Sequence, residues 1–184
     1  LDKIGPALEL GRSFIRPEYQ KNYSPLLLLW KGIGRIVMGN PRYKTLFGPV
    51  SINDEYNMLS KQLLTSFLKI NNYIPELARL VKPRRPFMPV PIRGIDVQAT
   101  SKFVRDIEDV SSLIAEIESD HKGIPILLKQ YLKLGGRLIG FNIDPQFSNV
   151  LDGLILVDLT RTEQRVLERY MTKEGAEAFL AFHT

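Results

Sequence analysis

The side chains of this chain that could do chemistry are carboxylates, hydroxyls, amides and guanidinium groups. The sequence has no cysteine and only two histidines, His121 and His183. This excludes thiol nucleophiles, disulfides and thiolate metal sites, and it leaves too few imidazoles for a multi-histidine zinc centre, so no metal site is expected. The sequence also has no Walker loop, no G-x-S-x-G elbow and no G-x-G-x-x-G turn. A reaction centre would therefore use acidic, basic and neutral polar groups.

The first candidate segment holds Glu9, Gly11, Arg12 and Ser13. Polar and apolar residues alternate here, which predicts a strand over residues 7–15. A carboxylate, a glycine, a guanidinium group and a hydroxyl thus fall close together within one predicted strand. A polar loop over residues 16–24 follows it.

The second candidate group lies between the last two predicted strands. It comprises Asn142, Asp144, Ser148, Asn149 and Asp152. These side chains could bind a polar ligand or its amine. The same residue types dominate ordinary turns, because their side chains hydrogen-bond to nearby backbone groups. The turn interpretation is favoured for any single residue of the group.

The third candidate is a proline-rich basic segment over about residues 71–99, where no helical or strand pattern persists. It contains Lys82, Arg84 and Arg85, with Arg79 and Arg93 nearby, and no acidic residue occurs from 77 to 95. It could dock an acidic protein or anionic lipid headgroups, or it could be a solvated loop. Nucleic acid is not expected as a partner, because aromatic residues suited to base stacking are not interleaved with the cations.

Strands and helices that alternate along the chain predict an α/β fold, a mixed sheet flanked by helices. Ser24 and Asn53 are the expected N-caps of the first two helices, and Gly48-Pro49 indicates a bulge or an edge in the second strand. We expect further strands over residues 43–52, 137–143 and 154–159, a turn over 144–149, and helices over 25–39, 54–70, 109–119, 125–134, 162–171 and 173–182.

Length and composition fit a single domain over residues 1–184. The chain has 184 residues, 44% hydrophobic and 24% charged, with a net charge of +5. The longest apolar run, residues 26–30, is far shorter than the ~20 residues that a membrane-spanning helix needs. The first residues do not resemble a signal peptide. We therefore expect a cytoplasmic protein that could contact the inner membrane surface peripherally.

The order of several short motifs resembles one acyltransferase group. Glu9 to Ile15, followed by Pro17 and Tyr19, looks like the central strand and strand-to-helix turn of the acyl-homoserine-lactone synthase and N-acyl amino acid synthase branch of the GNAT superfamily. The chain is more closely similar to the hemolysin-related group that includes ornithine-lipid and glycine-lipid N-acyltransferases. The supporting stretches are residues 29–33, 46–52, 83–87, 131–136 and 140–159.

This resemblance implies a GNAT-like domain that moves a fatty acyl group, often 3-hydroxylated, from acyl carrier protein to the amine of an amino acid such as ornithine or glycine. The product would be a lyso-aminolipid. Alternatives are a synthase of an acylated signal, as the lactone synthases are, and a non-catalytic module that binds lipid or carrier protein. No bound cofactor is expected, since the acyl-phosphopantetheine donor is a substrate.

The resemblance also suggests roles for the first candidate segment. Residues 11–13 would supply a backbone N–H to the oxyanion, through a bulge in a central strand. Glu9 could accept the amine proton, or it could pair with Arg12 or another cation, and the pairing is favoured. Arg12 could hold the acceptor's carboxylate or act as a structural clamp.

Further residues are assigned to substrates by the same resemblance. Tyr19 and Ser51, with Asn142, Asp144 and Asp152, are the expected substrate-binding residues. Lys82, Arg84 and Arg85 would dock the carrier protein or lipid.

Two departures from the family pattern shape these expectations. The turn before the first helix lacks glycine and contains Pro25, so tight binding of the CoA pyrophosphate is not expected. This favours a carrier-borne donor over acyl-CoA. The resemblance also begins near the middle of a GNAT domain, so the N-terminal strands of the family have no counterpart in these residues.

Overall fold

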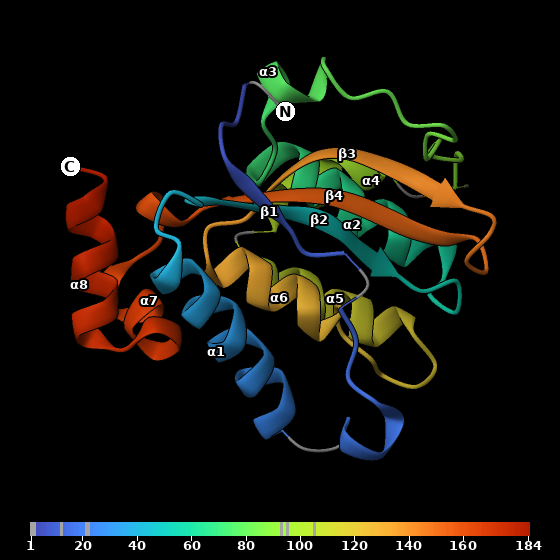
Figure 1. Ribbon diagram of the computed structural model, residues 1–184. Coiled ribbons are helices and arrows are strands. Elements are labelled where there is room, and N and C mark those ends of the chain that lie inside the picture. Colours follow the sequence, from blue (N-terminus) through green and yellow to red (C-terminus); the bar gives the residue numbers. More distant parts are fainter. Residues whose placement is uncertain (1–2, 12, 21–22, 93, 95, 105) are drawn as a thin grey trace. The chain divides into compact units, whose positions relative to one another are not determined.

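The first two strands run parallel and are joined through a helix (Figure 1). The computed structural model describes residues 3–11, 13–20, 23–92, 94, 96–104 and 106–184. Strand β1 (Ala7–Glu9) pairs with β2 (Thr45–Ile52), and helix α1 (Tyr23–Gly39) lies between them in the sequence. A helical crossover is the usual way to connect two parallel strands.

Strands β3 (Arg137–Asp144) and β4 (Val150–Asp158) form an antiparallel hairpin. The strand order is β1-β2-β4-β3, so the sheet is mixed and the predicted α/β class is confirmed. Ser148 and Asn149 have positive φ angles of 51° and 52° in the connecting turn, a conformation that Asn tolerates better than most residues. This confirms the turn predicted over residues 144–149.

Contacts divide the chain into two compact units. Unit 1 comprises Leu1–Gly48, Lys133–Gly135 and Val157–Thr184, and unit 2 comprises Pro49–Leu132 and Gly136–Leu156. In unit 1, α1 packs against α7 (Gln164–Met171) and α8 (Lys173–Phe182). The backbones of α1 and α7 approach closely, because a Cβ on Gly34 would lie 2.5 Å from the Tyr170 carbonyl oxygen.

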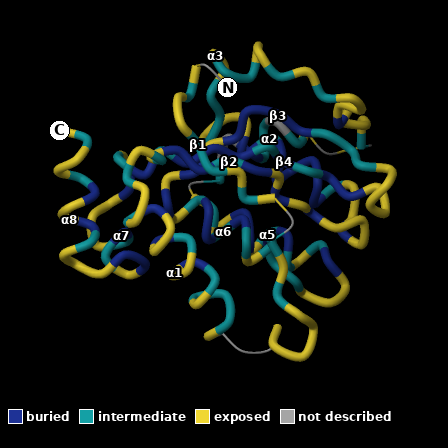
Figure 2. The backbone as a smooth tube through the Cα atoms, viewed as in Figure 1, coloured by how far each residue is buried: buried dark blue, intermediate teal, exposed yellow. Residues whose placement is uncertain are grey.

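Unit 2 is organised around α2 (Met58–Asn71). This helix contacts α4 (Val97–Phe103), α5 (Ile107–Ile117) and β3. The unit also holds α3 (Pro75–Ala78) and most of α6 (Ile126–Lys133). The apolar stripe of α2 is buried at Leu63, Leu64, Phe67 and Leu68, as its helical spacing predicts. Figure 2 shows how burial alternates with exposure along the elements.

Several predicted boundaries are wrong for local reasons. The strand expected over residues 7–15 ends at Glu9, and a 3-10 turn (Pro17–Tyr19) follows in the expected loop. Helix α2 begins at Met58, because the Asn57 side chain accepts a hydrogen bond from the Leu59 amide and takes the capping role expected of Asn53. Helix α1 already includes Ser24, its expected cap.

Other boundaries differ by only a few residues. The strand predicted over 154–159 extends over 150–158, and α5 begins at Ile107 because Asp106 caps it. The segment expected to be irregular over 71–99 contains the short helix α3 and the start of α4. Among the described residues, no helix is long and apolar enough to cross a membrane.

Candidate active site

Pairing between β1 and β2 stops at a glycine. The Leu10 amide donates to the Phe47 carbonyl oxygen at 2.7 Å, which makes Gly48 the residue opposite Leu10. A Cβ on Gly48 would lie 2.8 Å from the Leu10 carbonyl oxygen, so the two backbones can approach this closely only at a glycine. A parallel ladder would next need the N–H of residue 49, but Pro49 has none. The ladder therefore ends here.

The Gly11 N–H points away from β2, because the Leu10 carbonyl oxygen of the same trans peptide faces Gly48. It lies on the open edge of β1, where no other strand pairs among the described residues. Within the described part of the chain, the Gly11 and Ser13 amides have no backbone acceptor. Gly11 is exposed and Ser13 is half-buried. The resemblance implied a bulge in a central strand, but β1 has only β2 as a neighbour among the described residues and its pairing simply stops. Donors are thus present near the expected position for a different reason.

The other residues of this segment are less enclosed than their proposed roles require. Glu9 is exposed, and its Oε1 lies 3.2 Å from the position that a Cβ on Gly11 would take. Arg12, and with it the expected pairing of Glu9, lies outside the described residues. Tyr19 is exposed at the end of its 3-10 turn.

In unit 2, strands β2, β4 and β3 bring three of the predicted substrate-binding residues into one polar row. The Ser51 hydroxyl donates to Asp152 Oδ1 at 2.6 Å, and Asn142 is the register partner of Asp152 on the neighbouring strand. Asn142 Oδ1 accepts from the Arg85 amide at 2.8 Å. We call Ser51, Asp152 and Asn142 the polar row. Side chains 101 residues apart in the sequence meet within it.

The acidic members of this region have different environments. Burial, with the nearby charge of Asp144, raises the pKa of the Asp152 carboxyl, while the hydrogen bond from Ser51 acts in the opposite direction. Asp144 caps the β3–β4 turn, where its Oδ1 accepts from the Gln146 amide at 2.9 Å. Asp144 thus has the turn role that the sequence favoured, whereas Asp152 lies on a strand and is half-buried.

The structure links the proline-rich segment to this row. The Ile143 amide donates to the Arg85 carbonyl oxygen at 2.8 Å, and Pro86 forms a bridge with Asn142. Lys82, Arg84 and Arg85 are exposed, and none of them has a carboxylate partner among the described residues. Arg93, also part of the predicted basic segment, lies outside the described residues.

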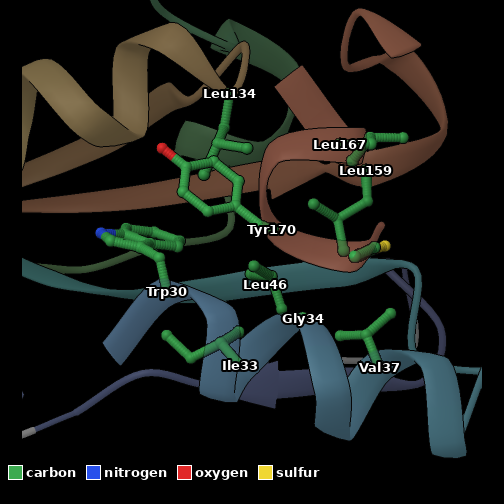
Figure 3. A pocket seen from close by; sticks show the side chains of 10 residues that line it. Trp30, Ile33, Gly34, Val37, Leu46, Leu134, Leu159, Leu167 and Tyr170 are labelled. Atoms are coloured by element: carbon green, nitrogen blue, oxygen red, sulfur yellow. The ribbon is translucent and has the colours of Figure 1, made fainter. Parts of the chain in front are cut away.

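The apolar stripe of α1 lines a small cavity in unit 1. Figure 3 shows Ile33 and Val37 of this helix below the Trp30 and Tyr170 rings, whose centroids are 5.9 Å apart. The cavity volume is about 10 Å³, room for about one water molecule. An acyl chain needs far more space than this cavity offers, so the side chains that line it pack in the core of unit 1.

Sequence reasoning missed two features. The Gly48-Pro49 pair was interpreted as a bulge or edge, although glycine followed by proline at the predicted end of a parallel ladder also indicates where pairing stops. The anchoring of Arg85 on Asn142 had no local signal, because it depends on a contact between residues 57 apart. In the described residues, no group of three or more His, Asp or Glu side chains could hold a metal ion.

Fold and site together define an α/β protein in which a parallel strand pair is followed by an antiparallel hairpin, an arrangement compatible with a GNAT-like fold. No family model and no solved structure matches the chain.

Two curated proteins are similar to it over most of its length, and both are named glycine N(alpha)-acyltransferase. The one from Bacteroides thetaiotaomicron is 30% identical over 171 residues, which are 86% of this chain and 49% of that protein. The one from Phocaeicola vulgatus is 26% identical over 165 residues, 82% of this chain and 48% of that protein. The chain thus spans about half the length of the curated relatives it matches.

Proposed function

We propose that this chain is part of an N-acyltransferase that moves a fatty acyl group from a phosphopantetheine thioester to the amine of a small amino acid, glycine in the first place. Two similar proteins named glycine N(alpha)-acyltransferase support an acyl transfer to glycine. The structural observation that carries it is the open edge of β1, where the Gly11 and Ser13 amides have no backbone acceptor in the described chain.

The reaction needs an oxyanion donor and a proton acceptor. The amine nitrogen attacks the thioester carbonyl carbon, the carbonyl oxygen becomes an oxyanion, and the carbon–sulfur bond then breaks to release the pantetheine thiol. The nitrogen loses one proton. Unpaired backbone N–H groups stabilise such an oxyanion by hydrogen bonding, and we assign this role to the Gly11 and Ser13 amides.

We assign the binding of the acceptor's amine to the polar row. The carboxylate of Asp152 attracts an ammonium group. A carboxylate with a raised pKa is also a better proton acceptor than an ordinary one. Asp152 meets this requirement through burial. Glu9, by contrast, is exposed. We therefore propose that Asp152 accepts the amine proton.

The donor we propose is acyl carrier protein carrying a 3-hydroxy fatty acyl group, with a lyso-aminolipid as the product. Purified chain is mixed with acyl carrier thioester or acyl-CoA and with glycine, alanine or ornithine. Free thiol and N-acyl product are then measured by a thiol reagent and by mass spectrometry. Product with the carrier thioester and glycine is expected. Absence of thiol release with every combination would overturn the proposal for this chain.

A pair of variants isolates the backbone donor. Gly11→Pro removes the N–H and should lower kcat by about 10²–10³-fold. Gly11→Ala keeps the N–H, and its Cβ would meet only the flexible end of Glu9, so its activity should stay near that of the unaltered chain. Equal activity of the two variants would remove the oxyanion role from Gly11.

A further inference from the structure

One segment of unit 2 carries several cations that are not neutralised within the described chain. We call residues 79–90 the basic loop. It contains Arg79, Lys82, Arg84 and Arg85, all exposed, and no acidic residue. None of the four forms an ion pair with a described residue. By contrast, the cations of the chain that do pair, such as Lys61 and Lys129, have a carboxylate within 2.7 Å.

Exposed apolar side chains are interleaved with these cations. Leu80 is 63% exposed, Met88 71% and Val90 53%. Single exposed apolar residues are common, but three within one short loop beside four cations are not explained by chance exposure. Figure 2 shows that most of the segment after α3 is exposed.

The backbone of the basic loop is nevertheless fixed. Arg85 donates its amide to Asn142 and accepts from the Ile143 amide, both at 2.8 Å. Phe87 is buried, and Val81 lies 3.4 Å from the position of a Cβ on Gly140. The inward-facing residues therefore hold the loop on β3, while the cations and the apolar side chains between them stay exposed. A partner gains these contacts without first paying for ordering the loop.

We propose that the basic loop docks on the surface of an anionic lipid bilayer. Lipid phosphates would bind the guanidinium and ammonium groups, and Leu80, Met88 and Val90 would enter the interfacial region. The unpaired cations complement the phosphate charges of an anionic bilayer, and the apolar side chains between them suit its interfacial region. This proposal does not depend on the proposed function, which uses other residues.

Vesicle flotation tests the proposal without turnover. The purified chain is mixed with vesicles of phosphatidylcholine alone, or of equal parts phosphatidylcholine and phosphatidylglycerol. We expect it to float with the anionic vesicles and to dissociate at high salt, since salt screens exposed charges. The triple variant K82A/R84A/R85A should bind about 100-fold more weakly, because each cation near an anionic surface contributes severalfold.

A matched control removes three cations elsewhere. R161A/R165A/K173A makes the same change in charge at exposed positions of unit 1, and it should leave vesicle binding within about twofold of the unaltered chain. Equal weakening by both triple variants would overturn the docking surface, because net charge alone would then explain the binding.

A second variant separates the apolar contribution. M88S/V90S keeps every cation and should weaken binding to anionic vesicles by about 10-fold or more, since burying each apolar side chain at the interface is favourable. Thermal unfolding checks that each variant is folded. Binding to purified acyl carrier protein, lost in K82A/R84A/R85A, together with no flotation on anionic vesicles, would overturn the proposal in favour of a protein partner.

Discussion

The end of β1 and the polar row differ in how much solvent reaches their carboxylates. Glu9, at the end of β1, is exposed, whereas Asp152 is half-buried beside Ser51. Burial disfavours the charged form of a carboxyl group, and the pKa of Asp152 is raised for this reason. The β1 segment instead offers backbone N–H groups. These can donate hydrogen bonds, but they cannot accept a proton.

Each region, taken by itself, suits a different chemical role. A donor to an oxyanion needs a backbone N–H without an acceptor, which the open edge of β1 supplies at Gly11. A proton acceptor needs a carboxylate whose basicity is raised by its surroundings, which the polar row supplies. The resemblance suggested the oxyanion donor at residues 11–13 and the base at Glu9, for which pairing with a cation was favoured. The polar row was not predicted as a unit, because it forms only when three strands pair.

The largest effect is expected for Asp152→Asn. The amide keeps an acceptor for the Ser51 hydroxyl but cannot take a proton, so kcat/KM should fall by about 10²–10⁴-fold. Steady-state kinetics with acyl thioester and glycine measure this. Asp144→Asn, in the neighbouring turn, is the matched control and should lose less than about 10-fold. Similar losses for both would remove the special role of Asp152.

The same variant has a predicted effect on stability. Because the folded-state pKa of Asp152 lies above its ordinary value of 3.8, the folded chain binds this proton more tightly than the unfolded chain does. The stabilisation that results is present at low pH and is lost as the pH rises above 3.8 through the folded-state pKa. Urea unfolding of Asp152→Asn should lack this loss, and an unchanged pH dependence would contradict the assignment.

Gly48→Ala should disrupt the pairing of β1 with β2. Its Cβ would meet the Leu10 carbonyl oxygen at 2.8 Å, so β1 and β2 must separate, at a cost of about 1–3 kcal/mol in the free energy of unfolding. Gly32→Ala is the control, since nothing lies within 4 Å of its Cβ and alanine favours a helix by about 1 kcal/mol. Chemical denaturation should thus move the two variants in opposite directions. Stabilisation by Gly48→Ala would contradict the close approach.

Ser51→Ala tests whether Asp152 sets the pH dependence of the reaction. The Ser51 hydroxyl donates to Asp152 and lowers the pKa of that carboxyl, so its removal should raise the pKa further. The rising limb of the pH–rate profile, which follows loss of the proton from the base, should move to higher pH by about one unit or less. A limb that stays in place or moves to lower pH would mean that Asp152 does not control it.

The spacing of apolar residues and the positions of glycine and proline predicted most of the fold. Gly135, with φ of 80°, ends α6 where the sequence expects a glycine stop, and α8 has the predicted bounds of residues 173–182. The strand expected over residues 7–15 failed because alternation continues to Ile15, whereas pairing depends on a proline in another strand. Local patterns record which residues suit a strand, not whether a partner with free N–H groups lies opposite.

The sequence predicted which residues belong to the candidate site better than it predicted how they are arranged. Ser51, Asn142 and Asp152 were named from polarity and resemblance, and the register of β3 and β4 brings the last two together. Their link to Arg85 could not be predicted, because a proline-rich segment has no periodicity that fixes which strand it meets. The burial that raises the pKa of Asp152 is likewise a property of packing and not of spacing.

The smallest effect is expected for Glu9→Gln. The Glu9 carboxylate is exposed and we assign it no contact with the substrate, so kcat/KM should fall by less than about threefold. The pH–rate profile of this variant should also keep its rising limb. A fall of 100-fold or more, with the limb lost, would move the proton acceptor from Asp152 to Glu9. Removing the base abolishes the rising limb of the pH–rate profile, whereas removing a charge that takes no part in the reaction only shifts that limb. The segment at the end of β1, and not the polar row, would then hold the base.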